Sequence, residues 1–175
     1  MKRITGCMLL LTVVFFACKS NDQNKIIGKW HAYKLENKMI DSDFIFTQKV
    51  IDTLGMGHDD ATNMSLYNTS NMDSLRKALQ IQHDEAFEVQ KNAVKNTIFT
   101  LNTNGIAIMS FNGEVDSSKW KLTNNTRLLF SDLKGPEGAD STAMDILVLN
   151  DTLLKVRMTK ETDTSVIFFR RESKS

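Results

Sequence analysis

Two short histidine–carboxylate clusters are the sequence features best suited to metal binding. They are His58-Asp59-Asp60 and His83-Asp84-Glu85. Ligands that share one face of a helix stand three or four residues apart, and no His, Cys, Asp or Glu stands at those offsets from His83. We therefore expect both clusters to be structural or solvated. A weak metal site in which the two clusters converge stays open as an alternative.

No motif for covalent or phosphoryl chemistry is found along the chain. The sequence has no Gly-x-Ser-x-Gly, Gly-rich phosphate loop, CxxC or HExxH. It carries 22 Lys and Arg against 21 Asp and Glu, which excludes the basic excess typical of nucleic-acid binders. We expect a protein that is not an enzyme and has no cofactor or metal. An enzyme with dispersed catalytic residues is the weaker alternative.

Cys18 is the residue with the clearest predicted chemistry. A short basic segment, Met1-Lys2-Arg3, precedes an uncharged apolar run over residues 8–17, and the chain turns polar over residues 19–25. The run is shorter than the roughly 20 residues that span a bilayer, but it suits the core of a secretory signal. Phe15-Phe16-Ala17-Cys18 resembles the lipobox of bacterial lipoproteins. The resemblance implies that Cys18 is diacylated and becomes the new N-terminus after cleavage before it.

This interpretation predicts a lipoprotein signal peptide at residues 1–17 and a lipidated tether at residues 18–25. Ile4-Thr5-Gly6-Cys7 also fits the four-residue pattern, but no apolar run precedes it. An ordinary signal peptide that leaves Cys18 as a free thiol is the alternative. Removing residues 1–17 would leave 158 residues with a net charge of −1. Attachment to the membrane, which we expect to be the outer membrane of a bacterial envelope, would then depend on the acyl chains.

About eight strands are predicted to form an antiparallel up-and-down β-barrel. Short alternating runs follow one another from Asn96 to the C-terminus, and Asn104-Gly105, Asn112-Gly113 and Asn124-Asn125 mark tight turns between them. Eight tilted strands close a barrel that is filled by side chains or holds one small ligand. The expected strands are 26–36, 96–102, 105–111, 118–122, 127–131, 144–149, 153–158 and 165–171.

Residues 37–95 are predicted to form an insertion after the first strand. Met72–Val94 lacks Gly and Pro and carries a partly apolar helical face, so we expect a helix there. Phe44–Leu54 fits either a strand or a helix, and Gly55–Thr69 has the composition of a loop. The insertion leaves the barrel at its open end. We therefore hypothesise that Phe44–Val94 covers the mouth as a lid or fills the cavity.

Gly28-Lys29-Trp30 opens the first strand, and the last strand ends in Arg170-Arg171. This pattern resembles the lipocalins, and more closely the lipocalin-like domain of uncharacterised bacterial lipoproteins, over residues 26–172. The resemblance implies that Trp30 plugs the closed end of the barrel and stacks on one of the two arginines, a cation–π contact. Lipocalins carry their helix after the barrel and usually have disulfides, so the chain departs from that family in both respects.

A small apolar or amphipathic ligand is the expected partner of the barrel interior. We expect alternate strand residues to line the cavity, while a packed core built from the same residues is the alternative. An envelope scaffold for protein interaction or assembly, with a filled barrel, is the alternative function. An open apolar cavity would favour the ligand, and an exposed apolar patch would favour a protein partner. The candidate residues are Phe99, Leu101, Ile106, Ile108, Trp120, Leu122, Leu147 and Leu149.

Overall fold

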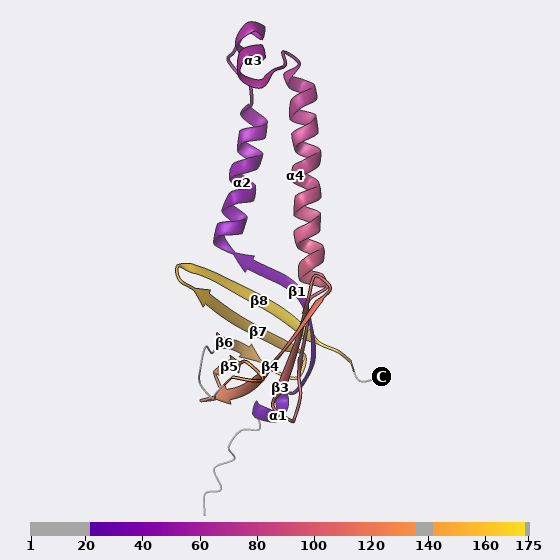
Figure 1. Ribbon diagram of the computed structural model, residues 1–175, viewed down its shortest axis with the longest axis vertical. Helices are drawn as coiled ribbons and strands as arrows, with labels where there is room; N and C mark the ends of the chain where they lie inside the picture. Colours follow the sequence, from indigo (N-terminus) through magenta and orange to yellow (C-terminus); the bar gives the residue numbers. More distant parts are fainter. Residues whose placement is uncertain (1–21, 136–141, 174–175) are drawn as a thin grey trace, which may run out of the picture.

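A computed structural model of the protein describes residues 22–135 and 142–173. Eight antiparallel strands pair in chain order, and the last pairs with the first, so the sheet closes into a barrel (Figure 1). The predicted up-and-down barrel with helices inserted after the first strand is confirmed. The strands are β1 (Gly28–Asn37), β2 (Ile98–Leu101), β3 (Ile106–Phe111), β4 (Glu114–Thr123), β5 (Arg127–Ser131), β6 (Thr142–Leu149), β7 (Leu153–Lys160) and β8 (Asp163–Arg171).

The predicted Asn and Gly turns join successive strands. Asn112 and Gly113 have φ values of 50° and 85°, and they form a two-residue loop between the paired residues Phe111 and Glu114. Positive φ at both central positions gives the turn a twist that matches the flanking strands. Asn124 and Asn125 also have positive φ, 53° and 57°, between β4 and β5. These turns therefore set which residues of neighbouring strands face one another.

Large apolar side chains fill the end of the barrel at which β1 begins. Trp30, Phe99 and Phe169 are at most 1% exposed there. A short helix, α1 (Asp22–Ile26), lies at this end, and Ile26 is fully buried. Residues 22–25, predicted as part of a polar tether, thus belong to a helical turn, whereas residues 18–21 lie outside the described part of the chain. This end of the barrel is closed.

Two bulges change which side chains of a strand face the interior. The register shifts between Ala32 and Lys34 in β1 and between Ile146 and Val148 in β6. A bulge adds one residue to a strand and so reverses the alternation beyond it. Ile146 packs against the core before the bulge, and Leu147 at the bulge is 41% exposed on the outer surface. The following Leu149 packs against the core instead.

Three helices form the insertion, and we call residues 38–95 the arm. α2 (Lys38–Thr53) packs side by side with α4 (Met72–Lys95), and α3 (Asp60–Tyr67) lies at the far tip (Figure 1). The helix predicted at Met72–Val94 is confirmed, and the ambiguous Phe44–Leu54 is helical except at Leu54. In the described part of the chain, no helix combines the length and apolarity needed to cross a membrane.

The prediction of a loop over Gly55–Thr69 is wrong for the eight residues of α3. The side chain of Asp59 accepts a hydrogen bond of 2.8 Å from the backbone N–H of Thr62, which caps the helix start. This bond satisfies one of the free N–H groups of the first turn. Asn71 caps α4 by accepting the N–H of Ser74 at 3.0 Å.

The two long helices of the arm hold each other through polar and aromatic contacts. The amides of Gln48 and Gln80 exchange two hydrogen bonds of 2.7 and 3.0 Å. The ring of Phe44 contacts the rings of His83 and Phe87, with centroids 5.4 and 5.3 Å apart. The arm therefore has its own seam, away from the barrel core.

The hypothesis that the insertion fills the barrel or covers the cavity is wrong. The arm projects away from the strands along the long axis of the molecule (Figure 1). No residue of 38–95 lines the cavity inside the barrel. α2 and α4 pack against each other instead.

Candidate functional site

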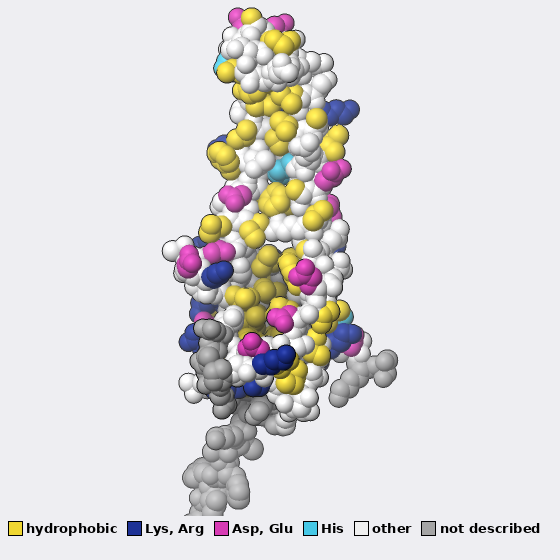
Figure 2. Space-filling view, in the orientation of Figure 1, with side chains coloured by type: hydrophobic (Ala, Val, Ile, Leu, Met, Phe, Trp, Pro, Cys, Tyr) yellow, Lys and Arg dark blue, Asp and Glu magenta, His cyan; other side chains and the backbone are white. Residues whose placement is uncertain are grey.

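A cavity of about 620 Å³ opens at the end of the barrel opposite Trp30. This volume lies within the range of pockets that hold small molecules. Figure 2 shows the hollow, with apolar side chains gathered inside it below the base of the arm. Strands β2 to β7 contribute its walls. The lining residues are Phe99, Ala107, Met109, Phe111, Glu114, Val115, Asp116, Ser117, Ser118, Phe130, Ser131, Asp132, Thr142, Met144 and Met158.

The deep part of the cavity is apolar. Phe99, Ala107 and Met144 are at most 3% exposed, and the ring of Phe130 lies 5.6 Å from that of Phe99. Met109 and Met158 pack against this core from β3 and β7. Methionine side chains adapt to irregular apolar shapes. The interior therefore offers an apolar surface that suits an alkyl or aromatic group.

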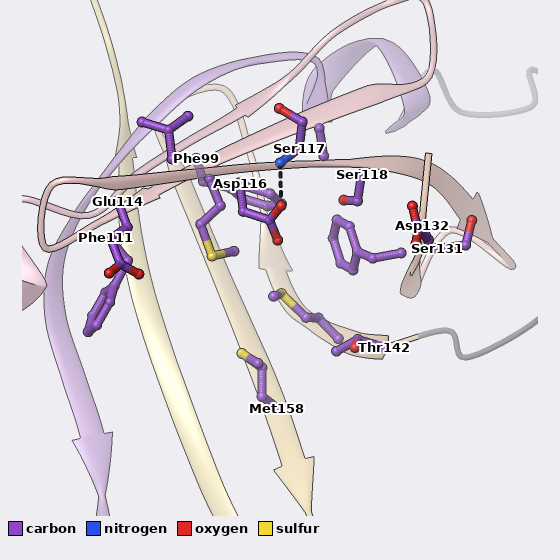
Figure 3. A pocket seen from close by; sticks show the side chains of 15 residues that line it. Phe99, Phe111, Glu114, Asp116, Ser117, Ser118, Ser131, Asp132, Thr142 and Met158 are labelled. Carbon is purple, nitrogen blue, oxygen red and sulfur yellow. Dashed lines mark hydrogen bonds between the residues drawn. The ribbon is translucent and has the colours of Figure 1, made fainter. Parts of the chain in front are cut away.

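The mouth of the cavity is polar. Figure 3 shows Asp116 and Ser118 pointing from β4 toward the space that Met158 reaches from β7, with Glu114 and Asp132 to either side. The carboxylate of Asp116 accepts the backbone N–H of Ser117 at 2.7 Å. Ser131 and Thr142 add hydroxyl groups at the ends of β5 and β6. An occupant would thus meet an apolar floor and a polar opening.

The structure separates the predicted ligand-binding residues into three groups. Phe99 lines the cavity. Leu101, Trp120 and Leu122 also face inward, but they belong to the packed core and do not line it. The prediction is wrong for Ile108 and Leu147, which are 36% and 41% exposed on the outer surface.

The register of the β2–β3 hairpin explains the error on β3. Phe99 pairs with Met109 and Leu101 pairs with Ala107. Paired residues point to the same face of a sheet, so Ala107 and Met109 face inward and Ile108 faces outward. Both faces of β3 carry apolar residues, and alternation within the strand did not distinguish them.

The residues that line the mouth were missed because β4 begins earlier than predicted. Its predicted start was Ser118, whereas the strand starts at Glu114. Counting back from Trp120 in steps of two places Ser118, Asp116 and Glu114 on the inner face. That periodicity is the signal by which the sequence could have identified them.

At the closed end, the Trp–Arg contact implied by the lipocalin resemblance is present, and it uses Arg171. The guanidinium lies 4.5 Å from the centre of the Trp30 ring, while Arg170 lies over Tyr33 on the outside of the barrel. The Trp30 Nε1–H donates to the carbonyl oxygen of Ile26 at 2.8 Å. Arg171 donates to the carbonyl oxygen of Lys25. These two hydrogen bonds hold helix α1 over the closed end of the barrel.

The backbone conformation at residue 28 explains why the Gly-x-Trp motif begins with glycine. Its φ of +145° lies in a region that residues with a Cβ rarely adopt. The guanidinium of Arg171 lies 3.5 Å from the position where a Cβ would stand. The motif therefore combines a backbone requirement at Gly28 with a packing requirement at Trp30.

Both histidine clusters lie in the arm, where His83 and Asp59 make structural contacts. A ring nitrogen of His83 lies 3.2 Å from the carbonyl oxygen of Phe44, across the two-helix seam. Asp59 caps α3. Within residues 22–135 and 142–173, no three His, Cys, Asp or Glu side chains lie close enough together to hold a metal ion. The two clusters do not converge.

Carboxyl groups with a shifted pKa lie on the outer surface of the barrel and in the arm. Hydrogen bonds from Lys29 and His31 hold the pKa of Glu172 below its ordinary value, and a hydrogen bond from Lys34 does the same for Glu36. Asp59 has a lowered pKa because Thr62 donates hydrogen bonds to it. Each of these contacts stabilises an ionised carboxylate at the surface, away from the cavity.

The sequence matches no protein-family model, and a search of curated proteins finds no match. Among solved structures, the chain is similar to the crystal structure of a DUF4847 family protein from Bacteroides vulgatus. The two share 10% sequence identity with a TM-score of 0.46, over 89% of this chain and the whole of that one. The assignment of the fold rests on the strand register of this chain itself.

Proposed function

We propose that this protein binds a small apolar or amphipathic molecule in its barrel, without catalysing a reaction. The cavity of about 620 Å³ with its apolar floor is the observation that supports this proposal. Eight-stranded barrels are often filled by their own side chains. Here the packed core occupies the closed end, and the strands beyond it leave room for an occupant.

Binding of N-phenyl-1-naphthylamine, a neutral apolar fluorophore, tests the proposal. The protein is the chain from residue 18 onward with Cys18→Ser, so that no acyl chain competes for the dye. We expect one saturable site that Met109→Trp blocks, because the new ring would occupy the cavity. Ile108→Trp is the matched control, since the neighbouring side chain points outward. Equal binding by the two variants would exclude the cavity as the site.

We also propose that the protein is a lipoprotein of the bacterial envelope, held at the outer membrane by acyl chains on Cys18. Support comes from the sequence alone: the basic start, the apolar run and the lipobox-like residues that end at Cys18. Two acyl chains hold a protein at a membrane where one holds only marginally. Cys18→Ala should move the protein from the membrane fraction to the soluble fraction. An unchanged distribution would refute lipidation at this residue.

A second candidate function is the docking of a partner protein on the arm. Many large apolar side chains of α2 to α4 are exposed, among them Ile45 at 70%, Phe46 at 67% and Val89 at 67%. Shallow apolar grooves of about 450 and 400 Å³ run along α2 and α4, and Figure 2 shows the apolar stripe between these helices. Exposed patches of this kind are typical of interaction sites.

A photo-crosslinking residue placed at Phe46 and tested in host cells examines the docking function. Discrete adducts at Phe46, and none at Lys160 on the barrel, would support it. Equal labelling at both positions would count against a specific partner.

A further inference from the structure

The cavity mouth carries charge of one sign. Glu114 and Asp116 face inward from β4, and Asp132 follows β5. None of the fifteen residues that line the cavity is Lys, Arg or His. Figure 3 shows the three carboxylates spread around the opening above the apolar floor. The lining thus has a negative rim and an uncharged interior.

Carboxylates on the outer wall of the barrel, in contrast, form ion pairs. Glu36 pairs with Lys34 at 2.6 Å, Glu172 with Lys29 at 2.8 Å, and Asp145 with Arg157 at 3.0 Å. In the described residues, Glu114, Asp116 and Asp132 have no Lys or Arg at ion-pair distance. Among the residues that the structure describes, no ion pair therefore neutralises their negative potential.

The arrangement does not suit a chelated metal ion. Ca²⁺ and Mg²⁺ need several oxygen ligands at about 2.0–2.6 Å from one point. The three mouth carboxylates do not meet this condition, since no group of three ligating side chains converges in the described chain. Spread charges of one sign instead favour a cation that moves among them and is held by the sum of their fields.

We infer that the cavity selects an amphipathic molecule with a positively charged head, such as an alkylammonium. The apolar tail would lie against Phe99, Phe130 and Met144, and the ammonium group would stay at the mouth beside Glu114, Asp116 and Asp132. The hydroxyl oxygens of Ser118 and Ser131 would accept hydrogen bonds from its N–H groups. This inference rests on the proposed function and adds the head-group chemistry to it.

Three ligands with the same tail test the inference: decylamine, decanol and decanoate. Each displaces N-phenyl-1-naphthylamine from the chain from residue 18 onward that carries Cys18→Ser, at pH 7 and low ionic strength. We expect decylamine to bind about 10-fold more tightly than decanol, and decanoate more weakly than both, because exposed ion pairs each contribute a few-fold. Raising the salt to 0.5 M should remove most of this preference.

The variant E114Q/D116N/D132N isolates the rim. It should bind decanol as the parent does and lose most of its preference for decylamine. The matched control is E36Q/D145N/E172Q, which neutralises three carboxylates on the outer wall and should keep the preference. The control also shows whether a change of net charge alone accounts for the effect.

The outcomes separate the two proposals. Decanol and decylamine binding with equal affinity, or a preference that survives in the rim variant, would overturn the inference and leave ligand binding in the cavity intact. Tighter binding of decanoate would overturn it in the same way. Failure of the dye and all three ligands to bind would overturn the proposed function and the inference together.

Discussion

Replacing Trp30 with Leu should remove the contacts that hold helix α1 and Arg171 at the closed end of the barrel. The ring is fully buried, its Nε1–H bonds the carbonyl oxygen of Ile26 at 2.8 Å, and Arg171 lies 4.5 Å from its centre. The hydrogen bond is worth about 1 kcal/mol. The smaller side chain loses about 1–2 kcal/mol of buried apolar surface. The cation–π contact adds about 0.5–2 kcal/mol.

These terms predict that Trp30→Leu lowers the free energy of unfolding by about 3–4 kcal/mol. Trp120→Leu is the matched control. Trp120 is also buried, and its Nε1–H donates to the carbonyl oxygen of Asn102 at 3.1 Å, but no guanidinium lies over its ring in the described structure. Its loss should be smaller by about 1 kcal/mol, the contribution of the cation–π contact.

Urea unfolding followed by circular dichroism measures both variants. A double-mutant cycle with Arg171→Met, which keeps an unbranched side chain without the charge, isolates the contact. We expect a coupling energy of about 0.5–1.5 kcal/mol between Trp30 and Arg171. A coupling near zero, or equal losses for the two tryptophans, would refute the role assigned to the Trp30–Arg171 pair.

Three further predictions concern the arm and its attachment. Gly55→Ala should destabilise the arm more than Gly57→Ala, as read by amide hydrogen exchange: both glycines have positive φ, which costs an alanine about 1–2 kcal/mol, but only at Gly55 would the new Cβ lie 2.6 Å from Met72. Equal effects would contradict the role of that contact. Asn37→Ala should cost about 2–4 kcal/mol, since Asn37 is buried, caps α2 and donates to Asp163 and Ser165; Asn71→Ala, which removes only the α4 cap, should cost about 1 kcal/mol in the same unfolding assay. Protonation of Asp59 should unwind α3: hydrogen bonds from Thr62 lower the pKa of this carboxyl, so its stabilising effect is present above the ordinary value near 4 and is lost as the pH falls through the lowered value. Asp59→Asn keeps an acceptor and should remove this pH dependence of the α3 amide signals in NMR spectra; a dependence that persists would exclude Asp59 as its source.

The sequence by itself determined the order of the strands. Turn residues such as Asn112-Gly113 and Asn124-Asn125 act locally, because their positive φ values reverse the chain within two residues. Short strands joined by such turns pair with their neighbours, so the meander followed without tertiary information. The long helix at Met72–Val94 was equally local, since its helix formers and its periodicity lie within one segment.

The tertiary structure decided which face of each strand is inside. Period-two alternation separates two faces but does not say which one is buried when both are apolar, as on β3. Pairing with Phe99 turned Met109 inward and left Ile108 outside. The bulge in β6 likewise turned Leu149 inward while Leu147 stayed outside, and no local signal marks it.

The cavity and the path of the arm also depended on contacts between distant segments. Glu114 and Asp132 come to one mouth because β4 and β5 pair antiparallel in a register that sets Lys119 opposite Ser131. The arm leaves the mouth uncovered because α2 and α4 pack on each other and project away from the barrel. Local patterns specified the elements of this protein, whereas the packing of those elements decided where an empty, negatively rimmed space remains.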